Sequence, residues 1–166
     1  MATSLDISDP GACRRLGLRL GELARPGDII LLEGTLGAGK TTLTRCIGEG
    51  LNLPAESRVT SPTFAIIHEH HGRLPLYHVD LYRLGGEDEI EDLGLEDYLY
   101  GEGLCVIEWP QRLGGALPAE YLRLTLDLFP DGSRRATLTA RGASWEERLD
   151  ALLAAARPYG QTGPAR

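Results

Sequence analysis

One short motif, at residues 34–41, constrains the fold of this chain more than any other feature of its sequence. The segment reads GTLGAGKT and matches the spacing G-x-x-x-x-G-K-[ST]. Its Lys40 is the only lysine among 17 basic residues, the others being arginines. A lysine in such a loop places a compact ammonium on a flexible stem between the β- and γ-phosphates of a nucleotide, where a planar guanidinium fits poorly. The motif therefore predicts a phosphate-binding loop.

The residues on either side of the motif favour the same interpretation. Residues 28–33 form an apolar run of strand length, and residues 41–51 have the pattern of a helix. In that setting, glycines let backbone N–H groups close around phosphates, the helix N-terminus adds partial positive charge, and the Thr41 hydroxyl can bind magnesium. The alternative is a glycine-rich turn with a surface lysine, which the strand-loop-helix context disfavours.

Length and composition limit the overall organisation. With 166 residues and 42% hydrophobic content, we expect a single domain over residues 1–156 and a flexible tail over residues 157–166. The net charge of −7, without an arginine-rich block, disfavours direct binding of nucleic acid. No apolar run reaches membrane-spanning length and the N-terminus lacks a signal-peptide pattern, so we expect a cytoplasmic protein with no membrane association.

The three cysteines also favour a cytoplasmic location. Cys13, Cys46 and Cys105 lack metal-type spacing and cannot all pair with one another. We interpret them as small buried hydrophobes of a protein in a reducing environment.

Hydrophobic periodicity and turn residues predict alternating helices and strands along the chain. Ser144 and Glu147 have the spacing of a capping box at the start of the last helix. The expected class is an α/β fold of the P-loop NTPase type, with a mixed, mostly parallel sheet flanked by helices and a C-terminal β-hairpin and helix. Besides the strand and helix beside the motif, the expected helices are 10–24, 87–97 and 144–156, and the expected strands are 4–8, 60–69, 74–81, 104–107, 121–128 and 134–140.

Two acidic residues follow apolar strands, where a P-loop enzyme needs carboxylates. Asp80 ends the run LYHVD, and Glu108 follows the run LCVI. Hydrolysis requires magnesium and an attacking water to be held at the same edge of the sheet as the phosphates. Either acid could instead be an ordinary strand-terminal residue facing water. Thr63, in a proline-stiffened loop, is a candidate for contact with the γ-phosphate or a magnesium-bound water, and its alternative is an ordinary loop before a strand.

Four motifs, in this order and at these separations, resemble the bacterial TsaE (YjeE) family. They are the P-loop with Thr42, the sequence SPT at 61–63, the sequence HVDLYRL at 78–84 and the sequence EWP at 108–110. Members of this family are ATPases needed to make the threonylcarbamoyl modification on adenosine beside the tRNA anticodon. The resemblance extends over residues 16–128. Thr35 departs from it, because family members often carry Asp there.

The resemblance implies a role for each matching residue, with ATP and Mg²⁺ as cofactors. Lys40 and Asp80 would be catalytic, with Asp80 orienting or deprotonating water. Thr41 and Glu108 would hold magnesium. The phosphate cradle and other nucleotide contacts would be Leu36, Gly37, Ala38, Gly39, Lys40, Thr41, Thr42, Thr63, Trp109, Gln111 and, of the pair Arg134 and Arg135, Arg134.

The resemblance also implies partners, namely TsaD and TsaB proteins of the tRNA modification complex, with tRNA contacted only indirectly. No arginine finger is evident in the sequence, so we expect slow turnover alone and faster turnover with a partner. A small-molecule kinase and a nucleotide-gated adaptor with negligible turnover are the alternatives. The acidic segment 87–97 fits a solvated helix face better than a docking surface for a basic partner.

Overall fold

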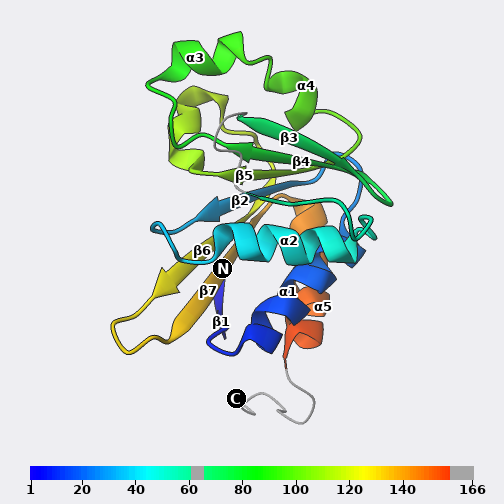
Figure 1. Ribbon diagram of the computed structural model, residues 1–166, viewed down its shortest axis with the longest axis vertical. Coiled ribbons are helices and arrows are strands. Elements are labelled where there is room, and N and C mark those ends of the chain that lie inside the picture. The colour runs from blue at the N-terminus through cyan, green and yellow to red at the C-terminus, as the bar shows by residue number, and fades with distance from the viewer. Residues whose placement is uncertain (61–65, 158–166) are drawn as a thin grey trace.

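The computed structural model describes residues 1–60 and 66–157, which form alternating helices and strands (Figure 1). The predicted strand runs have counterparts, although the run expected at 60–69 is a strand only from Ile67 and residues 61–65 of it lie outside the described residues. The hairpin across residues 130–132 forms as expected. The elements are β1 Ala2–Asp6, α1 Pro10–Leu23, β2 Ile29–Glu33, α2 Lys40–Gly50, β3 Ile67–His71, β4 Pro75–Asp80, α3 Glu87–Asp92, α4 Glu96–Leu99, β5 Leu104–Glu108, η1 Pro110–Ala116, β6 Tyr121–Leu128, β7 Arg134–Arg141 and α5 Ala143–Ala156.

Seven strands of the described residues form one mixed sheet, in the order β1-β7-β6-β2-β5-β4-β3. The four central strands, from β6 to β4, are parallel neighbours, while β1, β7 and β3 pair antiparallel at the two edges. β5 is buried along its whole length and β2 along all but its last residue, as expected for parallel strands covered on both faces. The predicted α/β class with a mixed sheet is confirmed.

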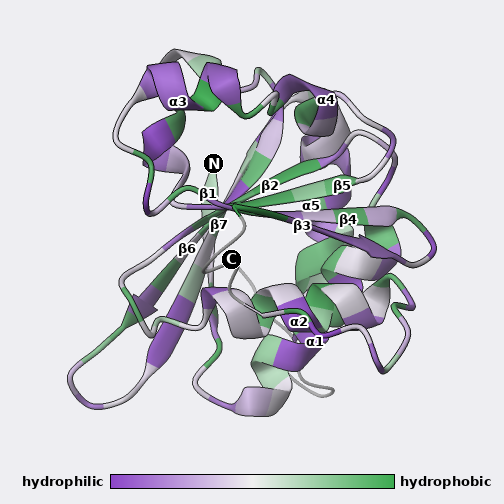
Figure 2. Ribbon diagram, turned by 45° about the horizontal axis from the view of Figure 1, so that its top comes forward, coloured by the Kyte–Doolittle hydropathy of each residue, from purple (hydrophilic) through white to green (hydrophobic). Residues whose placement is uncertain are grey.

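The helices cover the two faces of the sheet unequally. α1 and α2 lie on one side, and α3 and α4 lie on the other (Figure 2). The first side packs Leu16, Leu43 and Ile47 against β2 and also includes Trp145 and Leu152 of α5. None of the helices in the described residues is both long and apolar enough to span a bilayer.

The acidic segment 87–97 was predicted as one helix, and this is wrong. α3 ends at Asp92 and the shorter α4 begins at Glu96. Gly94 lies between them with φ of +63°, a left-handed conformation that ends a helix. The segment is therefore two short helices joined by a turn.

The predicted capping box of the last helix is also absent. α5 begins at Ala143, after Gly142 with φ of +99°, and has no side-chain cap. The Ser144 hydroxyl instead accepts a hydrogen bond of 2.9 Å from Nη2 of Arg148. Arg148 is buried and also donates two hydrogen bonds, of 2.6 and 2.8 Å, to the Asp28 carboxylate. The Ser144 side chain thus binds Arg148 of the buried ion pair and does not cap the helix.

The cysteines behave as small apolar residues. Cys46 and Cys105 are buried, Cys13 is half-buried, and all three are free thiols. Burial raises the pKa of the Cys46 thiol to about 11 and that of Cys105 to about 12. Both thiols are therefore protonated and unreactive near neutral pH.

Candidate functional site

The motif at residues 34–41 forms the loop between β2 and α2, as predicted. Gly37 and Gly39 have φ of +81° and +105°, so both use a conformation that residues with a side chain rarely adopt. Gly39 is the residue before the first turn of α2, and that turn has neither a side-chain cap nor an acidic residue. The partial positive charge of the helix N-terminus is therefore directed at the loop.

Lys40 is held inside this loop. Its side chain is almost completely buried, and Nζ donates to the backbone oxygens of Gly34 and Thr35 at 2.5 and 3.1 Å. Nζ also lies 4.5 Å from the ring centroid of Trp109. Burial lowers the pKa of the ammonium, while the charges of Glu108 and Asp80 act in the opposite direction.

The two predicted acids lie next to each other at the carboxyl edge of the sheet. Asp80 ends β4 and Glu108 ends β5, and they are register partners in this parallel pair. Oε2 of Glu108 lies 3.5 Å from the Thr41 hydroxyl at the start of α2. Asp80 accepts a hydrogen bond of 2.9 Å from the backbone N–H of Tyr82. The sheet thus brings both carboxylates to the P-loop, with Glu108 beside Thr41.

His78 is a site residue that the sequence analysis missed. Its side chain is completely buried, and Nε2 lies 2.5 Å from Oε2 of Glu108, which is itself only 3% exposed. With the carboxylate ionised, His78 donates this bond and fixes the orientation of Glu108 beside Thr41. The available signal was the spacing of His78 and Asp80, since residues two apart on a strand share a face.

Lys40, Asp80 and Glu108 line a cavity of about 370 Å³ at the P-loop. Arg134, at the start of β7, also lines this cavity. Its guanidinium lies close to the loop, since a Cβ added at Gly39 would be 3.3 Å from Nη1 of Arg134. Arg135 turns instead to the ring of Phe129, at 5.0 Å. The full lining is Leu36, Gly37, Gly39, Lys40, Thr41, Thr42, Asp80, Glu108, Trp109 and Arg134.

The N-terminal strand holds Arg134 in place. The backbone N–H of Ile7 donates to the carbonyl of Arg134 at 3.0 Å, and the N–H of Arg134 donates to the Ser8 hydroxyl at 2.9 Å. The segment after β1 therefore fixes the backbone from which this guanidinium extends.

A second hollow of about 370 Å³ adjoins the first and shares Trp109 with it. Gln111, predicted to contact nucleotide, lies here rather than at the P-loop cavity. The rest of its lining combines Gly34 and Thr35 of the predicted loop with three residues of β6 that were not predicted, because they reach the loop only when β6 pairs with β2. These three are Leu126, Asp127 and Leu128.

Trp109 stands at the junction of the two hollows in an unusual conformation. Its φ is +60°, which costs on the order of 1–3 kcal/mol for a residue other than glycine. Its ring packs against Tyr82 with centroids 4.8 Å apart, and Tyr82 is exposed. The strained backbone places the indole between Lys40 and Tyr82, next to both hollows.

The charges of the cavity suit a polyphosphate with a divalent cation. Lys40 and Arg134 supply positive charge, and glycines with no Cβ leave room for phosphates close to the backbone. Thr41 and Glu108 are oxygen donors of the kind that Mg²⁺ prefers beside phosphates. The residues present therefore fit ATP and magnesium. Two further residues were predicted to contact nucleotide. Ala38 is a buried residue of the loop, and Thr63, the predicted γ-phosphate contact, lies outside the described residues.

Comparison with known proteins gives one family. The profile described as "Threonylcarbamoyl adenosine biosynthesis protein TsaE" matches residues 7–136, a span that contains every residue of the P-loop cavity. Proteins named tRNA threonylcarbamoyladenosine biosynthesis protein TsaE are similar to this chain. The protein from Bacillus subtilis is 47% identical over 78% of this chain and 80% of its own length, and the one from Streptomyces coelicolor is 46% identical over 80% and 93%.

The fold has a solved counterpart. The crystal structure of YdiB from Bacillus subtilis superposes with a TM-score of 0.80 at 34% sequence identity, covering 93% of this chain and 95% of YdiB. The similarity therefore extends over nearly the whole of both chains.

Proposed function

Because the chain belongs to the TsaE family of tRNA threonylcarbamoyladenosine biosynthesis, we propose that it is the ATP-binding and ATP-hydrolysing subunit for that modification. In this proposal it acts on a complex of TsaB and TsaD and contacts tRNA only indirectly. One observation carries the proposal. Lys40 and Arg134 line the same cavity as the strand-terminal acids Asp80 and Glu108.

Phosphate binding would use the positive side of the cavity. Nζ of Lys40 would exchange the carbonyls of Gly34 and Thr35 for phosphate oxygens, and backbone N–H groups of the loop would bind the remaining oxygens. As the bond to the γ-phosphoryl loosens, negative charge spreads over its oxygens, and these fixed donors stabilise it without reorganising. Arg134 would add a second cation from β7.

The acidic side would manage the metal and the water. Thr41 and Glu108 would hold Mg²⁺, which when bound would neutralise negative charge on the phosphates. His78 would keep the Glu108 carboxylate in the orientation needed for this role. Asp80, the register partner of Glu108 on the next strand, would orient the attacking water or accept its proton.

The proposal also includes stimulation by the partner complex. A P-loop enzyme often needs an additional cation or an ordered loop at the γ-phosphate for fast hydrolysis. We therefore expect the purified chain to turn over slowly and the TsaB–TsaD complex to accelerate it.

Calorimetry and phosphate release test this function. The purified chain with Mg²⁺ should release or absorb heat on titration with ATP, and Lys40→Ala should abolish the signal. No heat from ATP or ADP at millimolar ligand would refute nucleotide binding. Phosphate release that requires an added acceptor would favour a kinase. An Asp80→Ala protein that still supports tRNA modification would favour a nucleotide-gated adaptor.

A further inference from the structure

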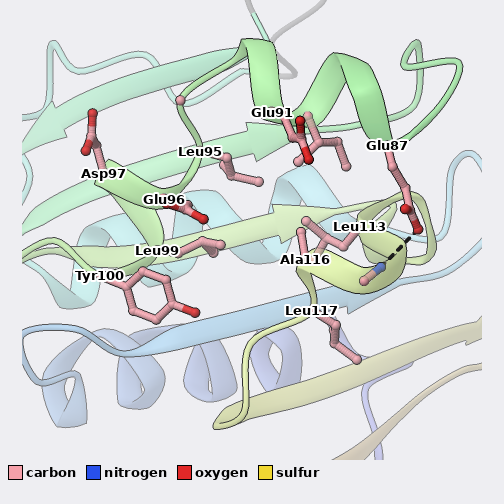
Figure 3. Close-up of a pocket in the computed structure, with 13 residues that line it drawn as sticks. Glu87, Glu91, Leu95, Glu96, Asp97, Leu99, Tyr100, Leu113, Ala116 and Leu117 are labelled. Carbon is pink, nitrogen blue, oxygen red and sulfur yellow. Dashed lines mark hydrogen bonds between the residues drawn. The ribbon is translucent and has the colours of Figure 1, made fainter.

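A third cavity, of about 640 Å³, is separate from the two beside the P-loop. It lies on the opposite side of the sheet from α1 and α2, between α3, α4 and η1 (Figure 3). Figure 3 shows Leu95, Leu99 and Leu113 pointing into the space between these helices, and all three are buried. At its rim, Tyr100 is 72% exposed and Leu117 is 37% exposed. We call this cavity the α3–η1 groove. None of its lining residues also lines the P-loop cavity.

The rim of the groove carries charge of one sign. Four acids line it, namely Glu87, Glu91, Glu96 and Asp97, and all are exposed. Residues 85–111 contain no lysine, arginine or histidine, so nothing in this stretch neutralises the acids. An apolar floor with an acidic rim complements a ligand that has apolar side chains next to basic ones.

Both walls of the groove are continuous with the strands that end in the site acids. η1 begins at Pro110, two residues after Glu108, and α3 follows Asp80 by a connection of residues 81–86. Two hydrogen bonds join the walls. Nη1 of Arg112 donates to the carbonyl of Leu84 at 3.0 Å, and the N–H of Gly115 donates to Glu87 at 3.0 Å, the bond drawn in Figure 3.

We infer that the α3–η1 groove binds a segment of a partner protein that presents apolar side chains flanked by lysine or arginine. Such a segment would bury Tyr100 and Leu117 and neutralise the acidic rim. Because η1 and α3 lead directly into Glu108 and Asp80, occupation of the groove would act on the P-loop cavity and would be the route by which a partner stimulates hydrolysis. The choice of the TsaB–TsaD complex as the partner, and this last step, rest on the proposed function, whereas the groove itself is seen in the structure. RNA does not fit, because its phosphates would meet the acidic rim.

The test measures binding of the full-length chain to purified TsaB–TsaD complex. One variant reverses rim charge, Glu91→Lys with Asp97→Lys, and a second removes exposed apolar surface, Tyr100→Ser with Leu117→Ser. The matched control, Glu147→Lys with Asp150→Lys, makes the same charge change at exposed positions of α5. Thermal unfolding of each variant verifies that it is folded.

We expect both groove variants to bind the complex at least tenfold more weakly and to lose stimulated phosphate release. ATP binding and unstimulated hydrolysis should stay at the wild-type level, and the control should behave as wild type. Groove variants that bind as tightly as the control would overturn the inference. A crosslink from position 100 to RNA, or loss of a homodimer in the groove variants, would assign the groove to another occupant and also overturn it.

The same measurements separate this inference from the proposed function. If the wild-type chain binds the complex through the groove but gives no heat with ATP, the ATPase proposal fails and the docking site stands. If ATP binds and is hydrolysed but the wild-type chain does not bind the complex, the docking site fails and nucleotide hydrolysis stands.

Discussion

The two faces of the sheet are built in contrasting ways. One face carries α1, α2 and α5, of 14, 11 and 14 residues, and the other carries α3, α4 and η1, of 6, 4 and 7 residues. On the first face a Cβ added at Gly21 would come within 2.2 Å of the Ile47 carbonyl oxygen, whereas at Gly115 on the second it would meet nothing within 4 Å. On the first face α1 and α2 approach each other closely, whereas the second face holds the α3–η1 groove, and its close contacts, such as that of Gly114 with Glu87, lie in the groove walls.

The proposed site takes residues from both sides of this contrast. Lys40 and Thr41 begin the long, closely packed α2, while Asp80 and Glu108 lead into the short elements of the other face. The closely packed face therefore positions the phosphate-binding residues, and the strands that carry the two acids continue into the short helices of the other face. In the proposed mechanism, the face with α1, α2 and α5 therefore contributes most to stability, and the face with the groove receives the partner.

The largest effect on stability is expected at Arg148, on the closely packed face. Arg148→Met removes the charged partner of the buried Asp28 carboxylate and leaves it the hydrogen bond from the Arg25 backbone N–H, so the free energy of unfolding should fall by about 3–5 kcal/mol. Urea unfolding measures this loss. The control is Arg14→Met, which breaks an exposed pair with Glu49 and should cost less than about 1 kcal/mol. Similar losses in the two variants would contradict the assignment of stability to this buried pair.

Lys40→Ala separates function from stability within the same helix. The rate of ATP hydrolysis should fall by about 100- to 1000-fold, or roughly 3 kcal/mol in the barrier, because a preorganised cation at the phosphates is lost. The free energy of unfolding should change by less than about 1 kcal/mol, since burial already lowers the pKa of the ammonium and thus disfavours its charge in the folded state. Lys40→Arg should also be inactive, as a guanidinium does not fit the loop. An active arginine variant would show that charge alone suffices.

A pair of glycine substitutions compares the packing of the two faces directly. Gly21→Ala should lower the free energy of unfolding by about 1–3 kcal/mol, because the new methyl group overlaps α2. Gly115→Ala meets no neighbouring atom and should change stability by less than about 1 kcal/mol. Denaturant unfolding of both variants gives the comparison. If Gly115→Ala were as costly as Gly21→Ala, the second face would be as closely packed as the first.

The smallest predicted effect is a change of slope with pH. The pKa of Cys105 is 9.0 in its unperturbed state and about 12 in the folded protein, so below pH 9 the thiol is protonated in both states. Above pH 9 it ionises only in the unfolded chain, and it lowers stability by about 1.4 kcal/mol per pH unit. Cys105→Ala should remove this part of the decrease between pH 9.5 and 10.5, as measured by urea unfolding. An unchanged slope would mean that the thiol ionises in the folded protein as well.

Sequence reasoning succeeded where the signal is local. The P-loop lies within eight consecutive residues, and Asp80 and Glu108 each follow an apolar strand, so strand direction alone predicted that both acids reach the loop. The left-handed Gly94 that divides the acidic segment is a local signal too, but the run of helix-forming acids around it favoured one continuous helix.

The remaining features depend on contacts between distant parts of the chain. His78 bonds to a residue 30 positions away, and Ser144 is drawn from its expected cap by the buried pair of Arg148 with Asp28. The second hollow exists because β6 lies beside β2. Strand periodicity places His78 on the same face as Asp80, but it does not say which strands become neighbours, since strand order is decided by the packing of the whole sheet.

The support of Arg134 by the N-terminal segment has a consequence for how the protein matures. Ser8 and Arg134 are 126 positions apart. β1 pairs with β7, so it has no strand to pair with until β7 has been synthesised. A ribosome must therefore have made and released β7 before Arg134 takes its place in the cavity. Until then a nascent chain has the lysine loop without this arginine, so in the proposed function the complete phosphate site would form only after β7 has folded against β1.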